Sequence, residues 1–120
     1  MPAQKAPTRD LRGRALTYLA EILAYERKPA TNHHLAARDV DNLEAILRAG
    51  LKDRSVLVRQ EAVMALARIG TGDDLPVLER VAATDPGISK GIDAKYPGHY
   101  PVRYAAGLAI ERLARRLQQQ

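Results

Sequence analysis

Residues 53–70, DRSVLVRQEAVMALARIG, decide the fold of this chain. Ser55 is a good helix N-cap and Gly70 is a common stop signal, so the segment between them is delimited as one helix. The apolar side chains between these two residues recur at helical spacing, at Val58, Ala62, Ala65, Leu66 and Ile69. The pattern predicts an amphipathic, alanine-rich helix whose apolar side faces a core.

This helix has a second copy near the C-terminus, which predicts a repeat protein. Val58-Arg59 aligns with Val102-Arg103 at an offset of 44 residues, whereas Asp53, before the helix, aligns with Asp85 at an offset of 32. The difference of 12 residues is an insertion in the loop after Asp85. The repeating unit is therefore a pair of helices in 32 residues. Such pairs stack into a solenoid because one pair cannot bury its apolar face alone.

A fainter copy near the N-terminus predicts that the first helix is the second half of a repeat. The alignment has an offset of 47 residues and pairs Leu11-Arg12 with Val58-Arg59. It predicts that four side chains of the first helix face the core: Leu11, Ala15, Leu19 and Ile22.

The predicted fold class is all-α, an α-α superhelix of about five helices, or two and a half repeats. The expected helices cover 8–27, 39–53, 55–70, 73–84 and 101–117, with Asp39 or Asp41 as the N-cap of the second. We expect a flexible tail over 1–7, a single domain over 8–117 and a frayed end over 118–120.

The composition excludes several classes of protein. Hydrophobic residues make up 46% of the chain, which is too many for a disordered protein. There is no cysteine, so disulfides and thiolate zinc sites are excluded. No run approaches the roughly 20 apolar residues of a membrane span, and no signal peptide is evident, so we expect a cytoplasmic protein. The net charge of +5 permits a nucleic-acid partner, but interleaved acidic residues favour an ordinary solvated surface.

The motif residues resemble a known family. Asp53 followed by Val58-Arg59, Ala62, Ala65-Leu66 and Ile69-Gly70 resembles the HEAT repeat and, more narrowly, the short HEAT-like repeats named after phycobilisome lyases. The resemblance implies an α-superhelix that binds other proteins, without lyase chemistry. It also implies that Arg59 and Arg103 are structural and bond to loop acids or carbonyls, with Asp53 and Asp85 as the expected acids. The alternative is that both arginines bind an anion.

The second helix of each repeat lines the concave face in proteins of this kind, which implies a binding surface. We predict that seven side chains face a partner there: Gln60, Met64, Arg68, Tyr104, Leu108, Arg112 and Arg115. Among the cations, only Arg115 lies on this face itself, with Arg68 and Arg112 on its flank. A nucleic-acid-binding face should present more cations, so the pattern favours a protein partner, with Tyr and Met as adaptable contacts. The alternative is that a neighbouring helix covers Met64 and Leu108.

The loop over 86–100 is the second predicted site, because long loops in compact domains tend to be functional. It carries the insertion and brings Tyr96, His99 and Tyr100 close to Tyr104. A basic, Tyr-rich loop can grip a peptide, an acidic surface or single-stranded nucleic acid. The alternative is that these tyrosines cover the end of the core.

The sequence offers no catalytic pattern. His33 and His34, with His99, hint at a metal, but adjacent histidines diverge on a helix and no zinc-site spacing accompanies them. We therefore predict a non-catalytic scaffold or adaptor without metal or cofactor, monomeric or weakly self-associating. The alternative is a nucleic-acid-binding module that uses basic residues of the loop and of the helices, with Arg68, Arg112, Arg115 and Arg116.

Overall fold

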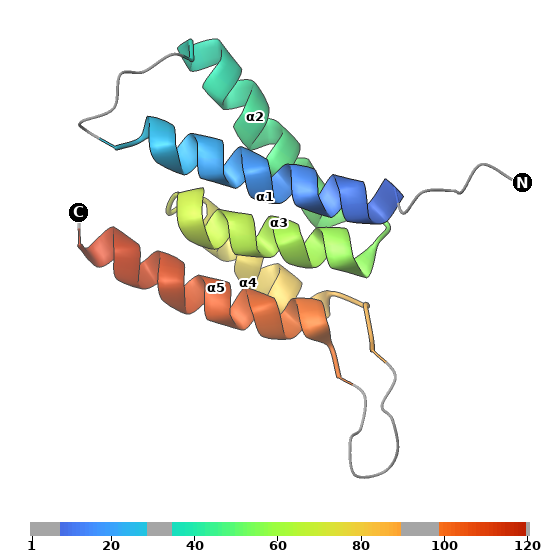
Figure 1. Ribbon diagram of the computed structural model, residues 1–120. Helices are drawn as coiled ribbons and strands as arrows, with labels where there is room; N and C mark the ends of the chain where they lie inside the picture. The colour runs from blue at the N-terminus through green and yellow to red at the C-terminus, as the bar shows by residue number, and fades with distance from the viewer. Residues whose placement is uncertain (1–7, 29–34, 90–98, 120) are drawn as a thin grey trace, which may run out of the picture.

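The computed structural model describes residues 8–28, 35–89 and 99–119. Its regular structure is helical, apart from an isolated antiparallel bridge between Ser89 and His99. The elements are α1 (Thr8–Glu26), α2 (Ala37–Ala49), the 3-10 turn η1 (Gly50–Lys52), α3 (Val56–Ile69), α4 (Asp74–Thr84) and α5 (Pro101–Gln118) (Figure 1). The all-α prediction is confirmed.

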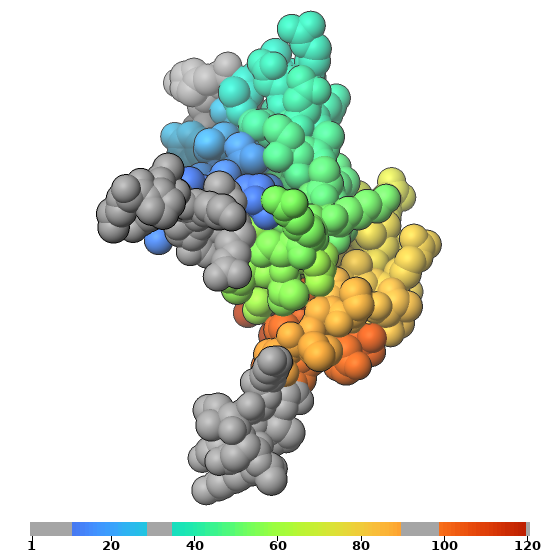
Figure 2. Space-filling model, turned by 90° about the vertical axis from the view of Figure 1, so that its right-hand side faces the viewer, coloured from blue at the N-terminus to red at the C-terminus, as the bar shows by residue number. Residues whose placement is uncertain are grey.

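The helices form two layers. α1, α3 and α5 run side by side, with α3 packed between the other two, and α2 and α4 lie behind them (Figure 1). The space-filling view shows the order along the stack, from α2 through α3 to α4 and the start of α5 (Figure 2). The core between the layers is aliphatic, and its largest fully buried side chains include Leu23, Leu47, Leu66, Ile69, Leu78 and Leu113. Helix pairs of this kind give the superhelix that the repeat predicted.

The boundaries of α3 follow from its two end residues. The Ser55 hydroxyl accepts a hydrogen bond from the Val58 backbone N–H at 3.4 Å, which satisfies a donor left open at the start of a helix. At the other end, the Gly70 N–H donates to the Leu66 carbonyl at 2.8 Å and closes the helix. The predicted helix between Ser55 and Gly70 is therefore confirmed.

The predicted start of α2 was wrong. The N-cap is Ala36, without a side-chain hydrogen bond, and the helix begins at Ala37 rather than at Asp39 or Asp41. The Asp39 backbone N–H already donates to the Ala36 carbonyl at 2.9 Å, so this residue lies inside the first turn. Asp39 still favours the helix there, because its negative charge lies near the positive end of the helix dipole.

The predicted core face of α1 was also wrong. Leu11, Ala15 and Ile22 are exposed and Leu19 is half-buried, whereas the buried side chains of α1 include Leu16, Ala20 and Leu23. The reason is that α1 packs against α2 and α3, and no helix of the described residues covers its other side. The alignment placed the correct residues at equivalent positions, but at this end of the stack no helix of the described residues packs against them.

Candidate functional site

A ladder of aspartate–arginine contacts fixes the second helices of the repeats relative to each other. Arg12 on α1 makes two contacts of 2.9 Å with the Asp53 carboxylate, and Arg59 on α3 contacts the Asp85 carboxylate at 2.9 and 3.2 Å. Arg59 also donates to the Asp53 carbonyl at 2.9 Å, and Arg103 on α5 donates to the Asp85 carbonyl at 2.7 Å. Each aspartate therefore joins two successive repeats.

The local sequence makes room for this ladder. A Cβ atom at Gly87 would lie 2.7 Å from the Arg59 guanidinium and 2.9 Å from Val56, so only glycine leaves space for the ion pair. The hydrogen bonds from Arg12, outweighing a small cost of burial, hold the pKa of Asp53 below its usual value. Asp85 links α3 to α5, because its carboxylate makes the charged two-point contact with Arg59 on α3 and its carbonyl accepts from Arg103 on α5.

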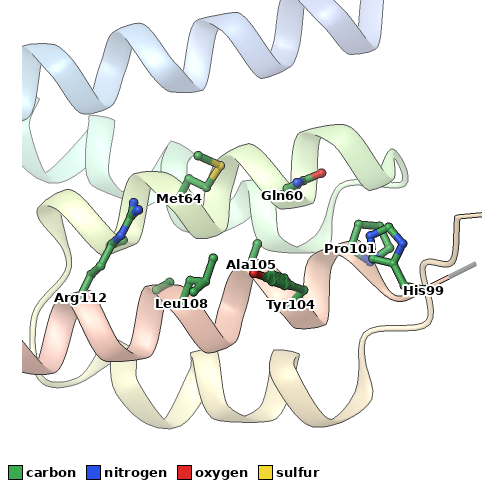
Figure 3. Close-up of a pocket in the computed structure, with 10 residues that line it drawn as sticks. Gln60, Met64, His99, Pro101, Tyr104, Ala105, Leu108 and Arg112 are labelled. Carbon is green, nitrogen blue, oxygen red and sulfur yellow. The ribbon is translucent and has the colours of Figure 1, made fainter. Parts of the chain in front are cut away.

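An elongated groove lies between α3 and α5, with a volume of about 240 Å³. Figure 3 shows its walls, with Gln60 and Met64 on α3 and with Tyr104, Leu108 and Arg112 on α5. His99 and Pro101 close the end nearest the start of α5 (Figure 3). The groove thus brings together six of the predicted site residues: Gln60, Met64, His99, Tyr104, Leu108 and Arg112.

The groove is apolar along its length and basic at one end. Met64, Leu108 and Tyr104 are exposed, and small side chains between them let the two helices approach: Ala67, Ala105 and Ala109. The exposed side chains disprove the alternative that a neighbouring helix covers Met64 and Leu108. Arg112 lines the groove one turn beyond Leu108. The exposed Arg68 and Arg115 lie in the last turns of α3 and α5. None of these three arginines has an ion-pair partner among the residues that the structure describes.

The other end of the groove is held by the residues before α5. Ser89 and His99 exchange backbone hydrogen bonds of 2.8 and 3.2 Å, and the Ser89 hydroxyl lies 2.8 Å from the His99 ring Nδ1. The Arg103 guanidinium stacks on the Tyr100 ring at 3.8 Å, so this tyrosine covers a rung of the ladder rather than the groove. Tyr96, the third predicted aromatic residue, lies outside the described residues.

Arg116 has a structural position. Its guanidinium donates to the Gly70 carbonyl at 2.7 Å and, more weakly, to the Ala67 carbonyl at 3.5 Å, which ties α5 to the end of α3. Burial lowers the pKa of Arg116, and the nearby charge of Arg27 lowers it further. The Arg116 side chain is therefore not a free cation for a nucleic-acid phosphate.

The described part of the chain offers no group of three His, Cys, Asp or Glu residues that could hold a metal ion. His33 and His34 lie outside the described residues, so the metal hypothesis based on them is not tested. In the same described part, no helix has the length and apolar character to cross a membrane. What the arrangement offers chemically is an apolar groove with hydrogen-bonding groups at one end and positive charge at the other.

The sequence did not reveal every residue of the site. The groove also includes Pro101, Ala105 and Ala109, which lie one helical turn or less from the predicted residues. Arg12 was aligned with Arg59 but was not recognised as part of the ladder, although the offset of 47 residues was a sufficient signal. Arg68, Tyr100 and Arg115 do not line the groove.

Comparison with known proteins agrees with this architecture. The family described as HEAT repeats matches residues 3–89, which include α1 to α4, and its members are commonly scaffolds for protein interactions. No curated protein and no solved structure gives a significant match. The two-layered helix pairs, the aspartate–arginine ladder and this match lead to one conclusion: the chain belongs to the HEAT-repeat family.

Proposed function

We propose that this chain is a non-catalytic scaffold or adaptor that binds a segment of another protein in the groove between α3 and α5. The observation that carries the proposal is the groove itself. Six residues chosen as partner contacts from two separate helices and a loop line one continuous depression, and its apolar side chains are exposed. Exposed Met and Tyr beside an Arg are typical of protein-binding surfaces.

The chemistry of the groove defines the segment that fits it. The apolar stretch formed by Met64, Leu108 and Tyr104 favours one or two large aliphatic or aromatic anchor side chains. Arg112, with Arg68 and Arg115 near the same end, favours an acidic residue beside those anchors. The ladder fixes the helices on both sides of the groove before a partner binds. Binding therefore costs little conformational entropy of this chain.

We infer further that the repeats are of the short kind found in phycobilisome lyases. The 32-residue period and the Asp53 to Arg59 spacing support this narrower assignment. A role as an accessory of a modifying enzyme is compatible with it. Lyase chemistry does not follow from it, because the fold hosts many functions.

Nucleic acid is the second candidate occupant, and the three arginines near one end of the groove favour it. Arg68, Arg112 and Arg115 are free of ion-pair partners within the described residues, so they could contact phosphates. Arg116 donates to a carbonyl of the protein backbone and is not available to a phosphate. Few cations therefore remain to neutralise a nucleic acid, which carries a negative charge on every nucleotide. The apolar walls of the groove therefore favour a protein segment.

The proposal is tested by a substitution that blocks the groove without disturbing the core. Leu108→Arg places a charge in the groove, and Val77→Arg is the matched control, because Val77 is exposed on α4 in the other layer. Each variant is immobilised, and its captured proteins are compared with those of the wild type. We expect a protein that is retained by the wild type and by Val77→Arg and lost with Leu108→Arg.

The same captured proteins on all three chains would contradict the proposal. Thermal unfolding of the two variants checks that both are folded, since both substitutions are at exposed positions. Retention of single-stranded DNA or RNA at low salt, lost on substitution of Arg112, would favour the second candidate instead.

A further inference from the structure

α1 carries an apolar seam along its outer side. Five exposed residues follow each other at alternating spacings of four and three: Leu11, Ala15, Tyr18, Ile22 and Tyr25. The four large side chains are between 45% and 64% exposed. This spacing is the heptad pattern of a helix that packs lengthwise against another helix. We call these five residues the α1 seam.

The other repeats show that this face of the helix is normally buried. At the offset of 47 residues, the first four seam residues correspond to α3 residues that are at most 3% exposed: Val58, Ala62, Ala65 and Ile69. Their equivalents on α5 are at most 2% exposed: Val102, Ala106, Ala109 and Leu113. They are buried because α3 packs against α1 and η1, and α5 packs against α3 and α4. On α1, no helix of the described residues takes the corresponding place.

A hollow adjoins the seam and adds to the apolar surface. It lies between α1 and α2, has a volume of about 250 Å³, and is lined by Ala15, Leu19 and Ile46 among others. Ile46 on α2 is itself 50% exposed. A contiguous apolar surface of this kind marks an interface in a soluble protein. The hollow has room for one large side chain of the covering helix.

We propose that the α1 seam is the interface with a second copy of this chain, with the two α1 helices packed antiparallel about a two-fold axis near Tyr18. Charge complementarity favours a second copy of the chain as the partner, and it favours the antiparallel direction of packing. Arg14 and Glu21 flank the seam, both are exposed, and neither has a partner among the described residues. Antiparallel packing places Arg14 of each copy beside Glu21 of the other, so the contact forms twice.

The antiparallel arrangement also matches the shape of the seam. It brings Tyr18 against Tyr18 of the second copy and Leu11 close to Tyr25 of the second copy, beside the hollow. Parallel packing would set Arg14 and Glu21 of the two copies at different heights along the interface, so this ion pair would not form. The interface lies on the outer side of α1 and does not depend on what binds between α3 and α5.

Sedimentation over a range of concentrations tests the proposal. The wild type is expected to dimerise reversibly, and Tyr18→Glu is expected to raise the dissociation constant by about tenfold or more, because it sets two like charges at the axis. The matched control is Tyr104→Glu, which changes an equally exposed tyrosine on α5 and is expected to leave the dimer intact. Arg14→Glu and Glu21→Arg are each expected to weaken the dimer, and the double variant is expected to restore it.

The absence of cysteine permits a second, independent test. A disulfide needs Cα atoms within about 7 Å, so a single Tyr18→Cys variant should cross-link to itself under mild oxidation, while Tyr104→Cys should not. A monomeric wild type would overturn the proposal. The α1 seam would then be an interface for a helix of another protein. Equal cross-linking of the two variants, or a double charge variant that fails to recover, would also overturn it.

Discussion

Arg59 and Asp85 form a two-point ion pair between successive repeats, and both side chains are largely removed from water. The Nε–Oδ2 and Nη2–Oδ1 distances are 2.9 and 3.2 Å, and the side chains are 12% and 5% exposed. The Asp85 carboxylate also accepts from the Gly87 backbone N–H at 2.9 Å. One pair of residues therefore joins α3, the end of α4 and the loop that leads to α5, which is the frame of the groove.

Replacing Arg59 by alanine should destabilise the protein strongly. The substitution leaves the buried Asp85 carboxylate without its partner, so the free energy of unfolding should fall by about 3 kcal/mol, a typical cost of breaking a buried pair. Denaturant unfolding measures it. Arg80→Ala is the control, since Arg80 is exposed on α4 and its substitution should have no measurable effect. Unfolding of Arg59→Ala at the wild-type midpoint would show that the ladder does not stabilise the stack.

Acid should unfold the protein in a defined range of pH. Burial alone would raise the pKa of Asp74, but hydrogen bonds from Arg48 and from the Thr71 backbone N–H outweigh it and lower the pKa, as Arg12 lowers that of Asp53. A carboxyl group with a lowered pKa in the folded state stabilises that state above the unfolded value, about 3.9, and this contribution is lost as the pH falls below it.

The melting temperature, measured from neutral pH down to pH values below about 3.9, should therefore fall most steeply at the acidic end. Asp74→Asn should lower the melting temperature at neutral pH and flatten its dependence on acid, because one of the titrating groups is gone. An unchanged slope in this variant would mean that Asp74 does not contribute to the acid transition.

Two glycine substitutions should have opposite effects on stability. Gly107→Ala should stabilise by about 0.5–1 kcal/mol, because a Cβ there meets nothing within 4 Å and alanine is the better helix residue. Gly50→Ala should destabilise by about 1–3 kcal/mol, because its Cβ would lie 2.7 Å from Leu16 and 2.9 Å from Ala62. Denaturant unfolding of both variants checks the prediction. A Gly50→Ala variant as stable as the wild type would disprove the close packing at Gly50, and a destabilised Gly107→Ala variant would disprove the open space at Gly107.

The sequence predicted those features that the period and the local capping chemistry determine. The Ser55 cap, the Gly70 stop and the 32-residue unit gave α3 and the order of the helices. The choice of Gln60, Met64, Tyr104 and Leu108 as groove residues followed from counting around two equivalent helices, and the structure places all four along one groove.

The features that depend on neighbouring elements could not be predicted in this way. Which side of α1 is buried depends on what packs against it, and the repeat alone predicted a core face for Leu11 and Ile22 that is in fact exposed. The contacts of Arg48 with Asp74, at 2.9 and 3.0 Å, and of Arg116 with the Gly70 carbonyl join residues far apart in the sequence at no repeat offset. Such pairs become visible only once the helices are placed.

Binding of a protein segment between α3 and α5 can be followed directly at Met64. The chain has two methionines, Met1 and Met64, so a sample with labelled methionine methyl groups gives a reporter inside the groove. The measurement is a methyl NMR spectrum with and without the protein that the wild type captures and Leu108→Arg does not. Occupation of the groove should shift the Met64 methyl resonance. A complex that forms while the Met64 resonance keeps its free position would contradict binding in the groove.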